Sequence, residues 1–284
     1  MNVSILLALG AMMAGALSDL IYRAVQRKGI DPPTFVFYQS ATFTLTIWAI
    51  AIATGQVSDI LPSTWVFGLP IGLVSYIGIL LFVTSMREGS ASINAPIFRL
   101  SFVITAVAAI FILHEPLNLP KLIGILLAVA GVLSLADLAA LRSGRGASPR
   151  SMLLLLAATL AFGIAGVLNK EATNQGSSTV PLVIVSTITF NGSSLLRMLL
   201  SRKLRPNTLT IRIAPFVGLL QLSWTVLLVE SLQTGDASIS FPIVQLSFVL
   251  TAILAVVFLG ERVSKGLVTG LSASTLAVLS FAFA

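Results

Sequence analysis

Apolar stretches of about 20 residues, the length that a membrane-spanning helix needs, recur along the whole chain and constrain its fold more than any other feature. At 1.5 Å per residue, each stretch is long enough to cross the roughly 30 Å hydrocarbon core of a bilayer. Charged residues make up 10% of the chain, against about a quarter in a soluble domain, and the mean hydropathy is +1.01. The sequence therefore predicts an all-α membrane protein.

Charged residues, Pro and Gly separate the apolar stretches from one another. The first stretch follows no positively charged region, and basic residues come after it, so it is predicted to be a span and not a secretory signal. The ten predicted spans lie near residues 3–25, 34–54, 65–86, 92–113, 119–139, 151–171, 179–199, 212–233, 238–259 and 265–284.

The second half of the chain repeats the first. A shift of 146 residues aligns Gly-Ser-Ala-Ser-Ile-Asn-Ala-Pro-Ile-Phe-Arg-Leu-Ser-Phe-Val at 89–103 with Gly-Asp-Ala-Ser-Ile-Ser-Phe-Pro-Ile-Val-Gln-Leu-Ser-Phe-Val at 235–249, and 19 positions are identical across 89–134. Each copy holds five spans, an odd number, so the second copy must enter the bilayer from the opposite side. The predicted domains are a first repeat at 1–141, a cytoplasmic linker at 142–150 and a second, inverted repeat at 151–284.

Basic residues are distributed unequally between the two sides of the membrane. The loops after the odd-numbered spans carry fourteen, and the opposite side carries two, Lys121 and Lys170. By the positive-inside rule the first side is cytoplasmic, which places both termini outside and predicts a multi-pass protein of the cell (inner) membrane. The fourteen are Arg23, Arg27, Lys28, Arg87, Arg142, Arg145, Arg150, Arg197, Arg202, Lys203, Arg205, Arg212, Arg262 and Lys265.

Composition also excludes several kinds of chemistry. The chain has no cysteine and a single histidine, His114, so disulfides, thiol catalysis and a metal site built from Cys and His are not expected. The net charge of +7 comes from residues in short loops, which indicates membrane orientation and not nucleic-acid binding. Neither a metal nor another cofactor is predicted.

Two matching segments carry a resemblance to a known family. Phe-Ile-Leu-His-Glu-Pro-Leu at 111–117 and Val-Phe-Leu-Gly-Glu-Arg-Val at 257–263 each end a helix of small residues and precede a Gly-bearing final helix. This pattern resembles the repeated domain of EamA-type transporters, in the drug/metabolite transporter superfamily. The resemblance implies ten helices around a central cavity that opens to one side at a time. It also implies substrates such as amino acids, nucleosides, sugar phosphates or drugs. Members are frequently drawn with both termini cytoplasmic, opposite to the charge count.

Arg99 is the most informative polar residue inside a span. It lies about seven residues into the fourth span, where insertion of an Arg costs about 2.5–3.5 kcal/mol, and its equivalent in the second repeat is Gln245. A guanidinium can bind a substrate carboxylate or phosphate with paired donors. It can equally form a structural ion pair with Asp19, at similar depth in the first span. Asp19 can instead carry a proton, because burial favours the neutral carboxyl.

Further polar and aromatic residues are candidates for lining a binding site, although each can also serve packing alone. Proline frees a backbone carbonyl that can bind a ligand, or it simply kinks the helix. Around the repeated Pro96 and Pro242 lie Asn94, Ser240, Gln245 and Ser247. On spans 2, 3 and 8 lie Tyr38, Gln39, Tyr76, Gln221 and Trp224.

Other residues are predicted to have structural roles. Glu115 and Glu261 each stand between a helix end and the next helix, where a carboxylate can cap free N–H groups. Lys170 and Glu171 are predicted to pair at the membrane interface. Glycines permit close helix contacts in a membrane, where the hydrophobic effect does not drive helix association. They are Gly68, Gly72, Gly78, Gly124, Gly131, Gly163 and Gly166.

The leading functional hypothesis is a secondary transporter, an exporter or exchanger of small polar or amphipathic metabolites such as amino acids or organic anions. It would work as a monomer in the lipid bilayer, with protons or a counter-substrate as possible drivers, because the chain has no nucleotide-binding P-loop. Multidrug efflux and a non-transporting accessory subunit remain alternatives. An intramembrane enzyme is disfavoured because no catalytic motif is visible within the spans.

Overall fold

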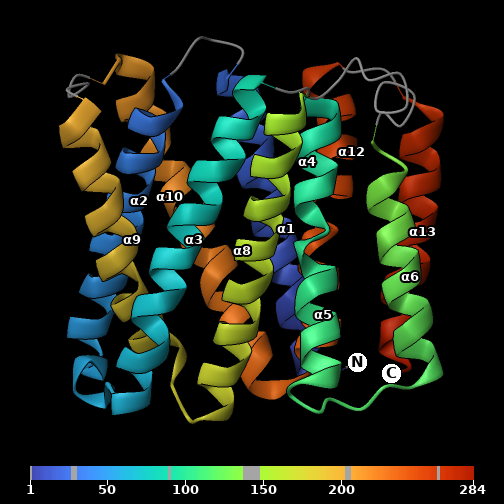
Figure 1. Ribbon diagram of the computed structural model, residues 1–284, viewed down its shortest axis with the longest axis horizontal. Helices are drawn as coiled ribbons and strands as arrows, with labels where there is room; N and C mark the ends of the chain where they lie inside the picture. The colour runs from blue at the N-terminus through green and yellow to red at the C-terminus, as the bar shows by residue number, and fades with distance from the viewer. Residues whose placement is uncertain (1, 27–30, 89–90, 137–147, 202–205, 261–262) are drawn as a thin grey trace.

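The computed structural model describes residues 2–26, 31–88, 91–136, 148–201, 206–260 and 263–284. These residues form helices that stand side by side, with no strand among them, and both ends of the chain lie on the same side of the molecule (Figure 1). We call this side the termini side. We call the opposite side, on which the exposed Arg150, Arg197, Arg212 and Lys265 lie, the basic side.

The helices follow the predicted spans closely. The first repeat contains α1 (Val3–Gln26), α2 (Pro32–Ala53), a 3₁₀ turn (Gln56–Asp59), α3 (Pro62–Glu88), α4 (Ala91–Arg99), α5 (Ser101–Phe111) and α6 (Leu119–Leu133). The second contains α8 (Pro149–Asn174), α9 (Thr179–Ser201), α10 (Thr208–Thr234), α11 (Ala237–Gln245), α12 (Ser247–Leu259) and α13 (Lys265–Ala282).

The apolar lengths of these helices fit a membrane protein. Among the described residues, 9 segments are long and apolar enough to cross a bilayer, if α4–α5 and α11–α12 each count as one. The remaining predicted span, at 119–139, corresponds to α6, which has 15 described residues. Residues 137–139 of that span, and 142–147 of the predicted linker, lie outside the described part of the chain. The fold is thus an all-α membrane protein of two five-span repeats.

Capping residues begin the helices at equivalent positions in the two repeats. Asn118 accepts a hydrogen bond from the backbone N–H of Lys121 (2.9 Å) at the start of α6, and its repeat equivalent Ser264 accepts one from Leu267 (3.1 Å) at the start of α13. Side-chain acceptors at this position satisfy N–H groups that the first helical turn leaves free. The repeat is therefore visible in local structure as well as in sequence.

Spans 4 and 9, for which the sequence predicts one helix each with a proline in it, are interrupted in the structure. Each is broken once, at Leu100 between α4 and α5 and at the equivalent Leu246 between α11 and α12. At both breaks the leucine N–H bonds a carbonyl three residues back, to Ile97 (3.0 Å) and Ile243 (3.1 Å), as in a 3₁₀ turn, and Leu246 also bonds the Pro242 carbonyl (3.2 Å) four residues back. A proline lies four residues before each break, and its ring and missing N–H disturb the helical turn that precedes it.

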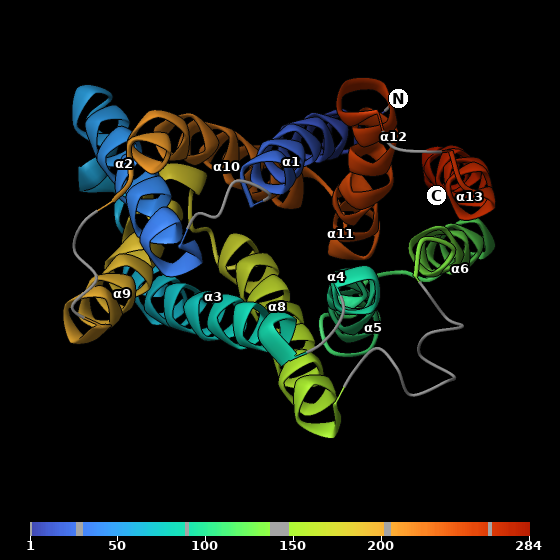
Figure 2. The same ribbon diagram turned by 90° about the horizontal axis from the view of Figure 1, so that it is seen from above.

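The two repeats interlock and run in opposite directions. Seen from above, α1 packs among α10, α11 and α12 of the second repeat, while α8 packs among α3, α4 and α5 of the first (Figure 2). The chain enters α1 on the termini side and α8 on the basic side. The first helix of each repeat is thus embedded in the other repeat, which makes one unit of the two halves.

Glycines permit the closest contacts between the repeats. A Cβ atom on Gly72 in α3 would overlap the backbone carbonyl of Ser186 in α9. At the equivalent place, a Cβ on Gly218 in α10 would overlap the carbonyl of Gln39 in α2. Each of the seven glycines predicted to permit helix contacts would place a Cβ within 3.0 Å of an atom of another helix.

Candidate functional site

A polar cluster joins the two broken spans to α1. The Arg99 guanidinium, at the last residue of α4, forms an ion pair with the Asp19 carboxylate of α1 and donates a second hydrogen bond to Gln245 Oε1 (3.0 Å) at the end of α11. Gln245 Nε2 in turn donates to Ser101 Oγ (3.3 Å) at the start of α5. We call these four residues the central cluster.

The central cluster lies on the pseudo-symmetry axis between the repeats. Arg99 and Gln245 occupy equivalent positions, and their side chains bond each other. Equivalent residues of two inverted repeats can touch only where the axis relating the repeats passes between them. Discontinuous helices that meet at a repeat interface form the substrate sites of many transporter folds. The cluster therefore occupies the position at which a transported ligand is expected.

The charged pair of the central cluster is not sealed from its surroundings. The Arg99 side chain is 18% exposed and that of Asp19 is 27% exposed, whereas Gln245 is 5% exposed. A charged side chain in contact with hydrocarbon is costly, so we interpret the accessible part of the pair as facing water or a ligand and not lipid. The guanidinium has further N–H donors, and a carboxylate has further acceptor positions, for such a ligand.

Two further candidates lie against α1 close to Asp19. Gln221 Nε2 on α10 donates to Ser18 Oγ (2.9 Å), beside Asp19 in the sequence. The Trp224 indole, one turn further along α10, would lie 2.8 Å from a Cβ on Gly15. Ser247 at the start of α12 also approaches Gly15, and its buried hydroxyl has no hydrogen-bond partner among the described residues. These residues can complete the wall around the charged pair.

Tyr38, Gln39 and Tyr76 make their described contacts elsewhere. Tyr38 packs with Phe35 and the start of α10, and Tyr76 makes an edge-to-face contact with Phe190 of α9 at 5.7 Å. Within the part of the chain that the structure describes, the Gln39 Oε1 and Tyr76 hydroxyl atoms are buried without a hydrogen-bond partner. The predicted grouping of these residues with Arg99 is not supported by any described contact, and a role in ligand binding remains a prediction.

Asn94 is held in a separate cluster near the basic side. Its side-chain N–H₂ donates to Ser85 Oγ and Ser151 Oγ, each at 3.2 Å, and Ser151 Oγ donates to the Ser85 carbonyl (2.9 Å). The residue is fully buried. These bonds tie the first turns of α4 and α8 to the end of α3, so they give Asn94 a structural role. Pro96, two residues further on, precedes the helix break, and Pro242 does so in α11.

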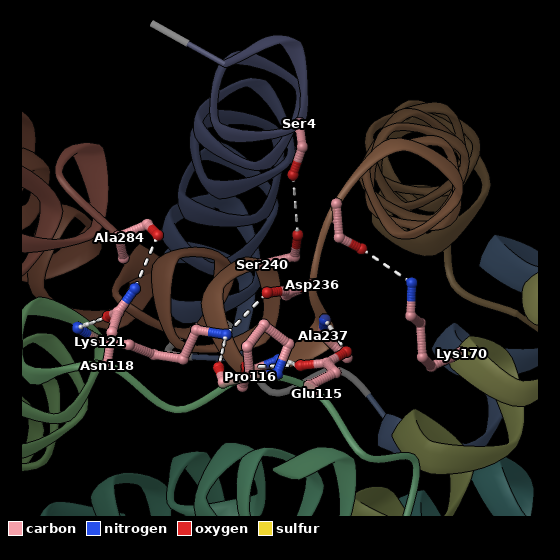
Figure 3. A network of polar contacts seen from close by, with 12 residues as sticks. Ser4, Glu115, Pro116, Asn118, Lys121, Lys170, Asp236, Ala237, Ser240 and Ala284 are labelled. Atoms are coloured by element: carbon pink, nitrogen blue, oxygen red, sulfur yellow. Dashed lines mark hydrogen bonds and ion pairs between the residues drawn. The ribbon is translucent and has the colours of Figure 1, made fainter.

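Glu115 caps a helix, but in the opposite repeat. The expectation was a cap on the next helix, α6, whose N-cap is instead Asn118. The Glu115 carboxylate accepts hydrogen bonds from the backbone N–H groups of Ala237 (2.7 Å) and Ser238 (3.0 Å), at the start of α11 (Figure 3). It also accepts one from the Ser238 hydroxyl. Its equivalent Glu261 lies outside the described residues.

The two lysines of the termini side face inward. Lys121 is 1% exposed and its ammonium pairs with Asp236 (2.7 Å), while Lys170 donates to the carbonyls of Leu232 (2.8 Å) and Gly235 (2.9 Å) (Figure 3). The predicted pairing of Lys170 with Glu171 was wrong, because neighbouring residues on a helix point in different directions. Asp236 had not been singled out. Its signal in the sequence was a charge at a position where the other repeat has Ser90.

The comparisons with known proteins agree with this architecture. A family model described as the EamA-like transporter family matches residues 2–136 and again residues 149–283. A protein of Sinorhizobium sp., described as an uncharacterized transporter in the cobO 3' region, is 30% identical over 131 residues, which are 44% of this chain and 93% of that protein. That relative therefore has about the length of one repeat.

A solved structure supports the fold at greater evolutionary distance. A protein of known crystal structure, 17% identical in sequence, superposes with a TM-score of 0.77 and covers 98% of this chain and 95% of its own. At this identity the similarity concerns the fold alone. The twofold match to the family model spans both repeats and nearly all of the described residues.

Proposed function

Because the chain belongs to the EamA-like transporter family, and so is a membrane transporter, we propose that it is a secondary transporter of small polar or amphipathic metabolites, such as amino acids or organic anions. It works by alternating access, as an exporter or exchanger, and is not an enzyme. The observation that carries the proposal is the Arg99–Asp19 pair, partly exposed on the axis between the repeats.

The chemistry of this pair favours ligands with a carboxylate. Arg99 offers paired donors to an anionic group, and Asp19 offers an acceptor to an ammonium group of the same ligand. An amino acid would replace both halves of the ion pair, while an organic anion would replace Asp19 alone. The binding energy lost by breaking the internal pair is thus recovered in contacts with the ligand.

The alternatives fit these residues less well. Multidrug efflux of hydrophobic cations would be favoured by an acidic residue without a basic partner, whereas Asp19 is paired with Arg99. A non-transporting accessory subunit would have no need of a partly exposed ion pair on the axis. A monomer suffices, since both repeats are in one chain, and protons or a counter-substrate provide the driving force.

A ligand screen of the detergent-purified protein tests the proposal. A ligand that binds only the folded state raises the apparent unfolding temperature, so we expect stabilisation by amino acids or organic anions and then flux of the same compounds into proteoliposomes. Sugar phosphates, nucleosides and hydrophobic cations serve as comparison classes. Stabilisation by hydrophobic cations alone would transfer the assignment to multidrug efflux. No stabilisation and no flux with any class, together with co-purification of a partner protein, would favour the accessory subunit.

We also propose that the basic side faces the cytoplasm and the termini side faces outward. The chain has no cysteine, so single cysteines can report the orientation. Ser58→Cys, exposed on the termini side, is expected to react with an impermeant maleimide in intact cells. Thr208→Cys, exposed on the basic side, is expected to react only after permeabilisation. The reverse pattern would invert the topology and support cytoplasmic termini.

A further inference from the structure

The turn between α10 and α11 is held from three directions on the termini side. Glu115 binds its far end, at the first residues of α11, and Lys170 binds its near end, at the last carbonyls of α10. Lys121 pairs with Asp236 in the turn itself. We call Glu115, Lys121, Lys170 and Asp236 the latch. Figure 3 shows Glu115, Lys121 and Lys170 around the segment of chain that carries Asp236.

Each charge of the latch complements the group that it meets. The start of a helix carries partial positive charge and the end carries partial negative charge. The Glu115 carboxylate meets the start of α11, and the Lys170 ammonium meets the end of α10. Hydrogen bonds with a charged partner are roughly twice as strong as neutral ones. The turn is therefore fixed by opposite charges at its two ends.

The latch joins the two repeats. Glu115 and Lys121 belong to the first repeat, whereas Asp236, Ala237 and Ser238 belong to the second. Lys121 also donates to the Pro116 carbonyl (2.5 Å), which ties its ammonium to the segment that carries Glu115. Opening the termini side by moving one repeat away from the other would separate these bonded groups. The latch therefore opposes that movement.

The ion pair of the latch is present on one side of the membrane only. Under the repeat shift, Lys121 corresponds to Leu267 and Asp236 to Ser90, so neither member of the pair has a charged counterpart. Glu115 and Lys170 do have counterparts of the same charge, Glu261 and Arg23, since contacts of α1 and α8 relate these two helices by 147 residues. Two inverted repeats of identical sequence would favour the two opposite conformations equally. An ion pair present on one side alone makes one of these two conformations more stable than the other.

We infer that the latch biases the unloaded transporter toward the conformation that is closed on the termini side and open on the basic side. The inference rests on the proposed alternating-access cycle, because the bias has meaning only where two such conformations exchange. With the basic side facing the cytoplasm, an unloaded protein that waits open on that side collects substrate from the cytoplasm. The latch thus gives the unloaded protein the resting conformation expected of an exporter.

Cysteine reporters on the two sides test this inference without any substrate. Ser240→Cys lies in α11 on the termini side, and Ser85→Cys lies near the end of α3 on the basic side, and both serines are fully buried. Each is introduced alone into the cysteine-free chain, and its labelling rate with a water-soluble maleimide is measured in proteoliposomes. Because the readout needs no ligand, a failed transport screen and a failed latch are distinguishable results.

The latch variant of choice is Lys121→Leu, which copies the second repeat at this position. The partly exposed Asp236 that it leaves behind can be solvated, whereas Asp236→Ser alone would strand a buried Lys121 cation. The double variant Lys121→Leu/Asp236→Ser removes both charges together. Asp59→Ser, which removes an exposed carboxylate from the same side, is the control.

We expect Lys121→Leu and the double variant to raise the labelling of Ser240→Cys by roughly ten-fold and to lower that of Ser85→Cys, because one population shifts at the expense of the other. Asp59→Ser is expected to change neither rate. Unchanged rates in both latch variants would overturn the inference. So would a rise at both reporters together, because the contacts would then stabilise the fold without choosing between conformations.

Discussion

Arg99→Gln is expected to abolish stabilisation by carboxylate ligands and to lower their transport by roughly 100-fold, while the protein still folds and inserts. Charge-assisted hydrogen bonds contribute about 1.5–3 kcal/mol each, so losing a paired set from a guanidinium costs at least this factor in affinity. The substituted side chain copies Gln245, which already occupies the equivalent position, so its shape is compatible with the repeat interface. Thermal-shift titrations and proteoliposome flux measure the two effects.

Two further variants separate the loss of ligand recognition from the effect of removing a charge elsewhere in the protein. Arg197→Gln removes an exposed guanidinium from the basic side and is expected to leave binding and flux unchanged. Asp19→Ala/Arg99→Gln removes both charges of the pair, copies Gln245 at the Arg99 position, and leaves no unpaired charge. We expect this double variant to fold as stably as the parent and still to bind no carboxylate ligand. Unaltered transport of every accepted substrate by Arg99→Gln would make the ion pair structural only.

The repeat explains why so much of the fold could be predicted from one sequence. The shift of 146 residues that aligns 89–103 with 235–249 also relates the Gly72 and Gly218 contacts and the Asn118 and Ser264 caps. Spans could be predicted because a bilayer requires about 20 apolar residues per crossing. The breaks at Leu100 and Leu246 could not be predicted in the same way. Hydropathy does not depend on backbone hydrogen bonds, and a proline can kink a helix without interrupting it.

The candidate site was only partly predictable, for a related reason. Arg99 and Asp19 stood out because charges inside spans are costly, and the structure pairs them. That Gln245 bonds Arg99 follows from how the repeats meet, which depends on packing between residues far apart in sequence. Likewise, Glu115 was expected to cap a nearby helix, because sequence separation is a poor guide to the partners of a loop carboxylate.

Gly72→Ala is expected to lower the apparent unfolding temperature by roughly 10 °C. The added Cβ would overlap the Ser186 carbonyl and the Thr189 hydroxyl, and a backbone carbonyl within a helix cannot move aside independently. Overpacking a well-packed interior costs typically 1–3 kcal/mol, and the clash with backbone places this case at the upper end. Such an energy corresponds to several degrees for a chain of this size. Thermal unfolding in detergent, followed by light scattering or tryptophan fluorescence, measures the shift.

Gly192→Ala makes the matched control, since it adds the same methyl group to α9, the helix against which Gly72 packs. Gly192 lies in α9, six residues beyond Ser186, and no atom of another described residue beyond its own helix and chain neighbours lies within 4 Å of a Cβ at that position. Ala is favoured over Gly in a helix by up to about 1 kcal/mol, so the unfolding temperature should be unchanged or slightly higher. Equal losses in the two variants would mean that helix α3 does not depend on a close approach to α9. A loss confined to Gly72→Ala would tie the stability of the first repeat to its contact with the second, as expected if neither repeat forms its core alone.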